Sequence, residues 1–161
     1  MQLFGSYEIC LFALRIEENG EKFYRHAAQL AQDKETRAMF NFLAEEEVRH
    51  KKTFETMLSK LEKRDIDESY PGEYLAYLKD YLDNKIIFSK QAIDGEFPDV
   101  KDTLSAIDFA IHREMNSILY YHETKRFVPN NQQDDIEKII EEERRHFSQL
   151  SDLKKNYRKM S

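Results

Sequence analysis

Apolar residues recur along most of the chain at alternating intervals of three and four, which is the spacing of one face of an α-helix. Residues that interrupt helices gather in three stretches: "SYPGEY" at 69–74, "DGEFPDV" at 94–100 and "VPNNQQ" at 128–133. The pattern predicts long helices over residues 6–32, 34–63, 99–127 and 132–157, and a shorter helix over about 71–92.

The connections between these helices predict how they pair. "AQDKET" at 31–36 and "VPNNQQ" are both short, so each should join two antiparallel helices into a hairpin. The connection between the two hairpins is long and carries the shorter helix. We therefore predict a single all-α domain over residues 1–161, with the connectivity of a ferritin-like four-helix bundle: two helical hairpins and a long crossover.

The two predicted hairpins also resemble each other in sequence. "ALRIEENGEKFY" at 13–24 aligns with "AIHREMNSILYY" at 110–121, and "LAEEEVRH" at 43–50 aligns with "IIEEERRH" at 139–146. The chain thus looks like two copies of one hairpin, and equivalent positions can be compared between the copies.

Each apolar face is interrupted by polar residues at its middle. The face of the second helix contains Glu47 and His50, and that of the fourth contains Glu143 and His146. The first and third helices carry Glu17 and Glu114, each followed by a small residue one turn later and by a tyrosine two turns later, Tyr24 and Tyr121.

Four carboxylates and two imidazoles should therefore meet inside the bundle. Burying an isolated carboxylate is expensive, and no lysine or arginine lies on these faces to offset the charge. Two divalent cations would balance four carboxylates. Oxygen and nitrogen ligands without thiolates suit iron or manganese and argue against a structural zinc site.

A single Glu-x-x-His pair carries little weight, because on the order of 0.6 such pairs arise by chance in a chain of this composition. The support comes from two pairs at equivalent places of a repeat. Glu18 and the other glutamates beside the pairs are expected on the surface. Tyr24 and Tyr121 are either core aromatics or hydrogen-bond partners of a ligand, and the sequence leaves both readings open.

Composition narrows the class of protein further. The net charge of −6 offers no basic surface to nucleic acid or to an anionic membrane. Cys10 is the only cysteine, so no intrachain disulfide can form. The first 20 residues lack the pattern of a signal peptide, and no run approaches the roughly 20 apolar residues of a membrane span. We expect a cytoplasmic location.

The quoted motifs, with Glu114, resemble those of the rubrerythrin-like branch of the ferritin-like di-iron superfamily over essentially the whole chain. The resemblance implies a centre of two iron ions, with manganese or zinc able to substitute. It also implies that Glu17 and Glu114 are terminal ligands, that Glu47 and Glu143 bridge the irons, and that His50 and His146 each bind one iron.

The sequence departs from its relatives at several points. It lacks the paired-cysteine motifs of a rubredoxin-like domain. Rubrerythrins also carry an additional glutamate one turn after the third-helix ligand, where this chain has Ser117. Val48 replaces the haem-binding methionine of bacterioferritins, and the residues after about Tyr157 are not expected to form the fifth helix of cage ferritins. A storage cage is therefore disfavoured.

Three functions fit these residues. The first is a di-iron oxidoreductase that reduces hydrogen peroxide or dioxygen with electrons from an external donor protein. The second is a ferroxidase or iron-handling protein whose substrate is ferrous iron. The third is a metal-stabilised helical sensor or adaptor module that acts through the aromatic row Tyr70, Tyr74, Tyr77 and Tyr81 of the crossover. We expect a homodimer in each case.

Overall fold

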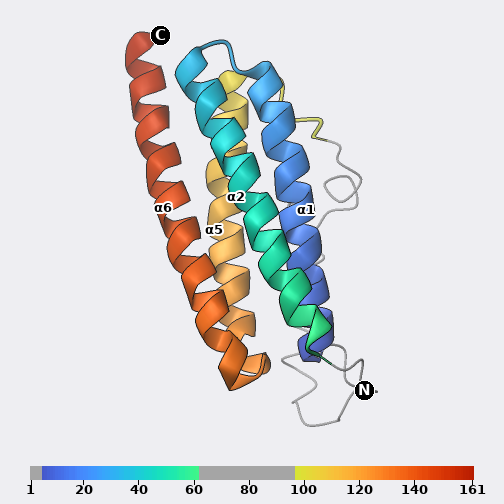
Figure 1. Ribbon diagram of the computed structural model, residues 1–161. Coiled ribbons are helices and arrows are strands. Elements are labelled where there is room, and N and C mark those ends of the chain that lie inside the picture. The colour runs from blue at the N-terminus through green and yellow to red at the C-terminus, as the bar shows by residue number, and fades with distance from the viewer. Residues whose placement is uncertain (1–4, 62–96) are drawn as a thin grey trace.

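The computed structural model describes residues 5–61 and 97–161, and these form a bundle of long helices (Figure 1). No strand occurs among the residues described. The helices are α1 (Ser6–Leu30), α2 (Lys34–Ser59), α5 (Thr103–Thr124) and α6 (Asn130–Met160), with a short 3-10 helix, η2 (Lys125–Phe127), after α5. The predicted helix over about 71–92 and the tyrosine row lie outside the described residues.

The starts of α2 and α5 are set by side-chain caps. The side chain of Asp33 accepts a hydrogen bond from the Thr36 amide at 2.8 Å and so begins α2. Asp102 does the same for α5 through the Ser105 amide at 2.8 Å, which explains why this helix starts after the predicted residue 99. α1 ends at Leu30, two residues before its predicted end, and α6 begins at Asn130, two residues before its predicted start.

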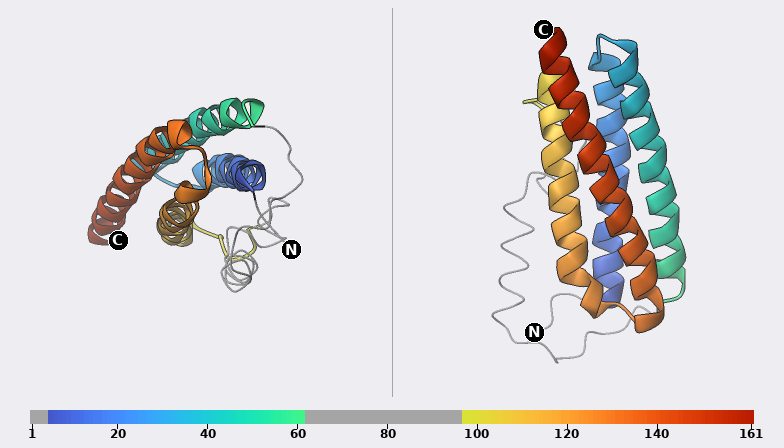
Figure 2. Two further views of the ribbon diagram at one scale, coloured as in Figure 1. Left: turned by 90° about the horizontal axis from the view of Figure 1, so that it is seen from below. Right: turned by 90° about the vertical axis from the view of Figure 1, so that its left-hand side faces the viewer.

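The two predicted hairpins are present. α1 packs along α2, and α5 packs along α6, while α1 also contacts α5 and α2 contacts α6. Figure 2 shows the four helices running side by side along one axis. The end of α2 and the start of α5 lie at opposite ends of the bundle (Figure 1), as the connectivity of a ferritin-like fold requires. The predicted fold class is confirmed.

Two apolar clusters fill the bundle. One lies toward the start of α1 and contains Ile9, Phe54 and Ile136 among its members. The other contains Phe23, Phe40 and Leu150. The middle of the bundle, between these clusters, is occupied by buried polar residues.

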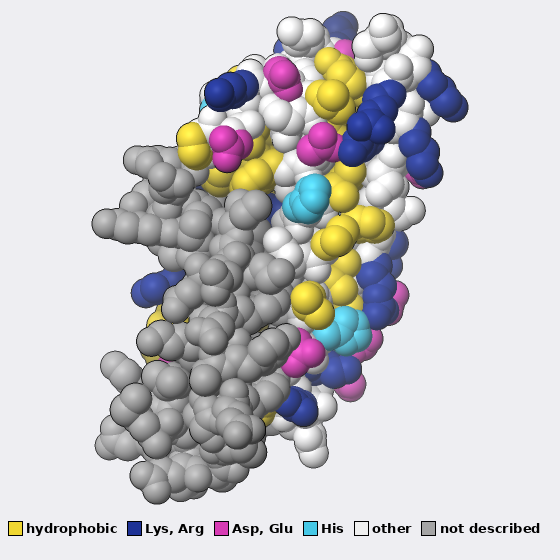
Figure 3. Space-filling model, turned by 180° about the vertical axis from the view of Figure 1, so that it is seen from behind, with side chains coloured by type: hydrophobic (Ala, Val, Ile, Leu, Met, Phe, Trp, Pro, Cys, Tyr) yellow, Lys and Arg dark blue, Asp and Glu magenta, His cyan; other side chains and the backbone are white. Residues whose placement is uncertain are grey.

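The outer surface also carries apolar side chains, as Figure 3 shows from behind. The large exposed ones on α5 are Met115 and Leu119. In the part of the chain described, every helix is too short or too polar to cross a membrane.

Candidate metal centre

Each of the four long helices places one glutamate at the middle of the bundle. Glu17, Glu47, Glu114 and Glu143 are fully buried, and the two histidines are nearly so, with His50 1% and His146 3% exposed. The apolar periodicity of each helix explains this placement, because every one of these residues occupies a core-facing position of its helix. The structure thus brings together all six residues that the sequence singled out.

The six residues form two overlapping groups. In the first group, ligand atoms of Glu17, Glu47, His50 and Glu143 all lie within 4.8 Å of one another. In the second, those of Glu114, Glu143 and His146 do so. Glu143 belongs to both groups, whereas Glu47 belongs only to the first.

The two histidines are oriented alike. His50 Nδ1 lies 3.4 Å from Glu17 Oε2 and 3.2 Å from Glu143 Oε1, and His146 Nδ1 lies 3.1 Å from Glu143 Oε2. The two rings are stacked, with centroids 5.9 Å apart. Both Nδ1 atoms therefore face the glutamates at the centre.

The opposite nitrogen of each ring faces an outer carboxylate. His50 Nε2 lies 2.7 Å from Glu142 Oε2, and His146 Nε2 lies 3.6 Å from Glu46 Oε2. A hydrogen bond from the outer nitrogen fixes the ring and leaves the inner nitrogen free to bind a cation. Burial lowers the pKa of His50, but the charge of Glu143 and the hydrogen bond to Glu142 outweigh it and raise this pKa overall.

Two tyrosines link the repeats crosswise at the centre. The Tyr24 hydroxyl donates to Glu114 Oε1, and the Tyr121 hydroxyl donates to Glu17 Oε1. Burial, reinforced by the neighbouring carboxylates, raises the pKa of both phenols well above the ordinary value. Both tyrosines are therefore protonated donors to the buried glutamates as well as core aromatics.

A buried arginine at the centre was not predicted. Arg113 is only 2% exposed, its Nη1 lies 3.2 Å from Glu47 Oε1, and its Nη2 donates to the Ile16 carbonyl oxygen at 2.6 Å. The sequence predicted no lysine or arginine among the buried glutamates, and this prediction is wrong. Arg113 lies beside that face, and its long side chain reaches across to α2. Burial lowers the pKa of Arg113, but Glu47 outweighs this and raises it.

A signal for Arg113 was present in the repeat. It aligns with Ile16, an apolar position of the first copy, and it lies three residues after Ala110 and four before Ser117. All four of these residues are buried. A charged residue aligned with a core isoleucine marks a position where a cation enters the interior.

The buried atoms at the centre fit a metal. Five of them have no hydrogen-bond partner among the residues described: Glu17 Oε2, Glu47 Oε2, His50 Nδ1, Glu114 Oε2 and Glu143 Oε1. An unsatisfied buried polar atom is destabilising, and five in one place fit the binding of a cation. Carboxylate oxygens with imidazole nitrogen are ligands that iron and manganese accept.

The pKa shifts of the glutamates show the same need for positive charge. Burial raises the pKa of Glu47 and of Glu114 well above the usual value, and neighbouring glutamates add to this. Burial also disfavours ionised Glu143, but the adjacent Glu114 carboxyl, the charge of His50 and the contact with His146 hold its pKa well below the usual value. Without a cation, Glu47 and Glu114 thus retain protons that a metal would displace.

Other candidate residues lie away from the centre. Glu18 is exposed, as expected. Cys10 is fully buried in the apolar cluster near the start of α1, and burial raises the pKa of its thiol to about 12. It is therefore an unreactive core thiol.

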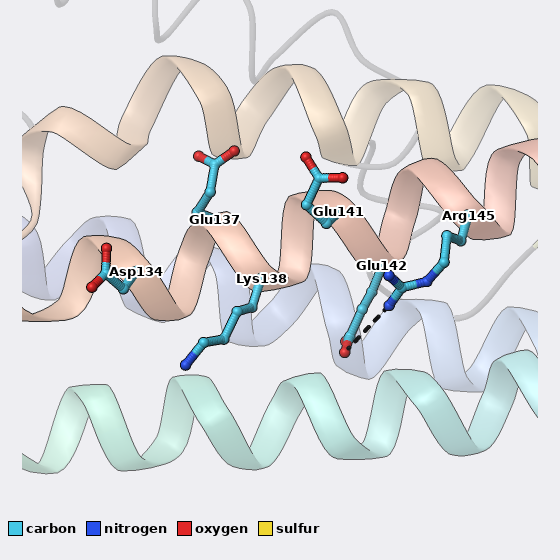
Figure 4. A pocket seen from close by; sticks show the side chains of 6 residues that line it. All are labelled: Asp134, Glu137, Lys138, Glu141, Glu142 and Arg145. Carbon is cyan, nitrogen blue, oxygen red and sulfur yellow. Dashed lines mark ion pairs between the residues drawn. The ribbon is translucent and has the colours of Figure 1, made fainter.

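A surface pocket adjoins the centre along α6. It is lined by Asp134, Glu137, Lys138, Glu141, Glu142 and Arg145. Figure 4 shows Lys138 and Glu142 directed toward α2, and Glu137 and Glu141 directed toward α5. Glu142 connects the two regions, because it lines the pocket and also contacts His50.

The bundle and its buried glutamate and histidine groups together define a ferritin-like protein with a di-metal carboxylate site. The rubrerythrin family model matches residues 8–154, so the chain belongs to the rubrerythrin family. It is also similar to a crystal structure from Thermotoga maritima described as a ferritin-like diiron-carboxylate protein. The two share 27% identity and a TM-score of 0.72, over 96% of this chain and 97% of that one. No curated protein sequence matches the chain.

Proposed function

We propose that the protein is a non-haem di-iron oxidoreductase that reduces hydrogen peroxide or dioxygen with electrons from an external donor. The observation that supports this most strongly is the pair of buried ligand groups that share Glu143 and leave five ligand atoms without partners. Membership of the rubrerythrin family supports iron as the metal.

In this proposal, Glu17, Glu47, His50 and Glu143 hold one iron, and Glu114, Glu143 and His146 hold the other. Manganese or zinc could occupy the same ligands. When bound, two ferrous ions supply the two electrons that, with two protons, convert one hydrogen peroxide to two water molecules.

The chain's own residues prepare this site in three ways. Tyr24 and Tyr121 each donate a hydrogen bond to a glutamate of the opposite repeat and so fix the carboxylates Glu114 and Glu17. Glu142 orients the His50 ring. The apolar clusters on both sides of the centre exclude water, which strengthens each electrostatic interaction within it.

The proposed source of the electrons is another molecule. The sequence has one cysteine and no paired-cysteine motif that could hold a second iron site. We propose an external electron-donor protein and a cytoplasmic homodimer as the working form.

The test is anaerobic loading with ferrous iron, followed by stopped-flow absorbance and iron counting after addition of peroxide or dioxygen in separate runs. Two irons per chain, oxidation by the oxidant and repeated turnover with a reductant are expected. Continued consumption of added ferrous iron would favour iron handling instead. Bound iron without turnover would favour a sensor or adaptor, and no bound iron would overturn all of these.

A further inference from the structure

The two repeats differ at one pair of contacting positions next to the centre. In the first pair, Gly20 of α1 faces Arg113 of α5. The repeat-equivalent residues are Ser117, which aligns with Gly20, and Ile16, which aligns with Arg113. One half of the centre thus has a glycine and an arginine where the other has a serine and an isoleucine, although all four residues are buried.

Gly20 provides the space that Arg113 occupies. A Cβ atom at position 20 would lie 2.1 Å from Arg113 Nη2, 2.5 Å from its Cζ and 2.6 Å from Glu47 Oε2. Any other side chain would displace the guanidinium or the carboxylate. Glycine in a helix interior is destabilising, so its presence at the middle of α1 is explained by this close contact.

Arg113 gives Glu47 a different environment from Glu143. Glu47 Oε1 lies 3.2 Å from Arg113 Nη1, which leaves Oε2 as its oxygen without a hydrogen-bond partner. Glu143 instead faces one histidine with each of its two oxygens, at 3.2 Å from His50 and 3.1 Å from His146. This difference matches the two ligand groups, of which Glu143 belongs to both and Glu47 to one.

We propose that Arg113, lodged against Gly20, is a positioning residue that restricts Glu47 to the His50 side and so makes the two metal positions unequal. The position of Glu17, Glu47, His50 and Glu143 then fills first, and that of Glu114 and His146 fills second. This inference rests on the metal centre of the proposed function and adds to it an order of loading.

The number of ligands supports the same order. The position on the His50 side has four ligand residues, whereas the other shares Glu143 and adds only Glu114 and His146.

The test is a titration of the metal-free full chain with Mn²⁺, followed by electron paramagnetic resonance. In the wild type, the six-line signal of an isolated ion should grow up to the first equivalent and then fall, as the second ion couples to the first. The informative variant is Gly20→Ser with Arg113→Ile, which gives this half the residues of the other half. The ratio of the two dissociation constants should then fall by about tenfold or more.

Two further variants distinguish an effect on metal loading from a loss of protein stability. Gly20→Ser alone should lower the melting temperature of the metal-free protein because its Cβ meets Arg113, and adding Arg113→Ile should recover part of that loss. Arg144→Ile removes an exposed arginine that contacts Glu141 and His122, and it should keep the two-step titration.

One-step loading of the wild type, or unchanged two-step loading of the double variant, would overturn the inference. Absence of bound Mn²⁺ would overturn it together with the metal centre. Ordered loading without peroxide or dioxygen turnover would instead contradict only the proposed function.

Discussion

Single carboxylates at the centre have distinct neighbours, so their substitutions should have distinct effects. Glu47 pairs with the buried Arg113, and removing one partner of a buried ion pair costs about 3–5 kcal/mol because the other charge is left uncompensated. Glu47→Gln keeps an oxygen that can accept from Arg113, whereas Glu47→Ala does not.

We therefore expect Glu47→Gln to fold and to lose the absorbance of a bridged iron pair, and Glu47→Ala to be several kcal/mol less stable as well. Urea unfolding of the metal-free proteins and absorbance after iron loading measure the two effects. Glu45→Gln, two residues earlier on the exposed side of α2, is the matched control. Retained bridged-iron absorbance in Glu47→Gln would remove Glu47 from the site.

The crossed tyrosines lead to a second prediction at this scale. Tyr24→Phe and Tyr121→Phe each remove the donor to a buried glutamate, and loss of such an outer contact typically weakens metal binding by about 10–100-fold. Binding isotherms with Mn²⁺ measure it. Tyr120→Phe is the control, because Tyr120 is equally buried but donates to the Ile9 carbonyl oxygen, away from the glutamates. Equal affinities in all three variants would contradict the role.

At the scale of elements, side-chain caps determine where α2 and α5 begin. Asp33 begins α2 by accepting from the Thr36 amide, and the same helix supplies Glu47 and His50 to the centre. Slight burial raises the pKa of Asp33, but this hydrogen bond outweighs burial and lowers it overall. The charged carboxylate is thus favoured in the folded state.

We expect Asp33→Ala to lower the stability of the metal-free protein by about 1 kcal/mol, and Asp33→Asn to have little effect because asparagine also caps helices. Because the folded pKa is lowered, the stability from ionised Asp33 is present above its unfolded pKa and disappears as the pH falls through the folded pKa. Urea unfolding at several pH values checks this. A pH-independent difference between wild type and Asp33→Asn would contradict the electrostatic part.

At the scale of the whole molecule, bound metal should stabilise the folded bundle. The four helices meet at a layer of buried glutamates whose ligand atoms lack partners, so the metal-free bundle is destabilised at its middle. A ligand that binds only the folded state stabilises it by about 2.7 kcal/mol at a concentration of 100 times the dissociation constant.

Loading with Mn²⁺ or ferrous iron under anaerobic conditions should therefore raise the melting temperature. For a domain of this size, each kcal/mol corresponds to a shift of about 2–4 °C. Circular dichroism melts with metal, without metal and after chelation measure the change. The same melting temperature in all three conditions would mean that the buried glutamates are satisfied by protons alone.

The sequence by itself determined the hairpins, the bundle and the convergence of six candidate ligand residues, because these follow from periodicity and from a repeat. Glu17 and Glu114, like the Glu-x-x-His pairs, lie on core-facing positions that can be recognised without coordinates. Helix ends were predicted less accurately, since Asp102 rather than the apolar pattern sets the start of α5.

Only the tertiary structure decided which atoms meet across helices. Arg113 lies beside its apolar face, and whether it points to solvent or to Glu47 depends on the space that Gly20 leaves on another helix. Likewise, the crossed contacts of Tyr24 and Tyr121 depend on how α1 and α5 are placed against each other. Periodicity tells which side of a helix is buried, but the partner of each buried atom is fixed only by packing between helices distant in sequence.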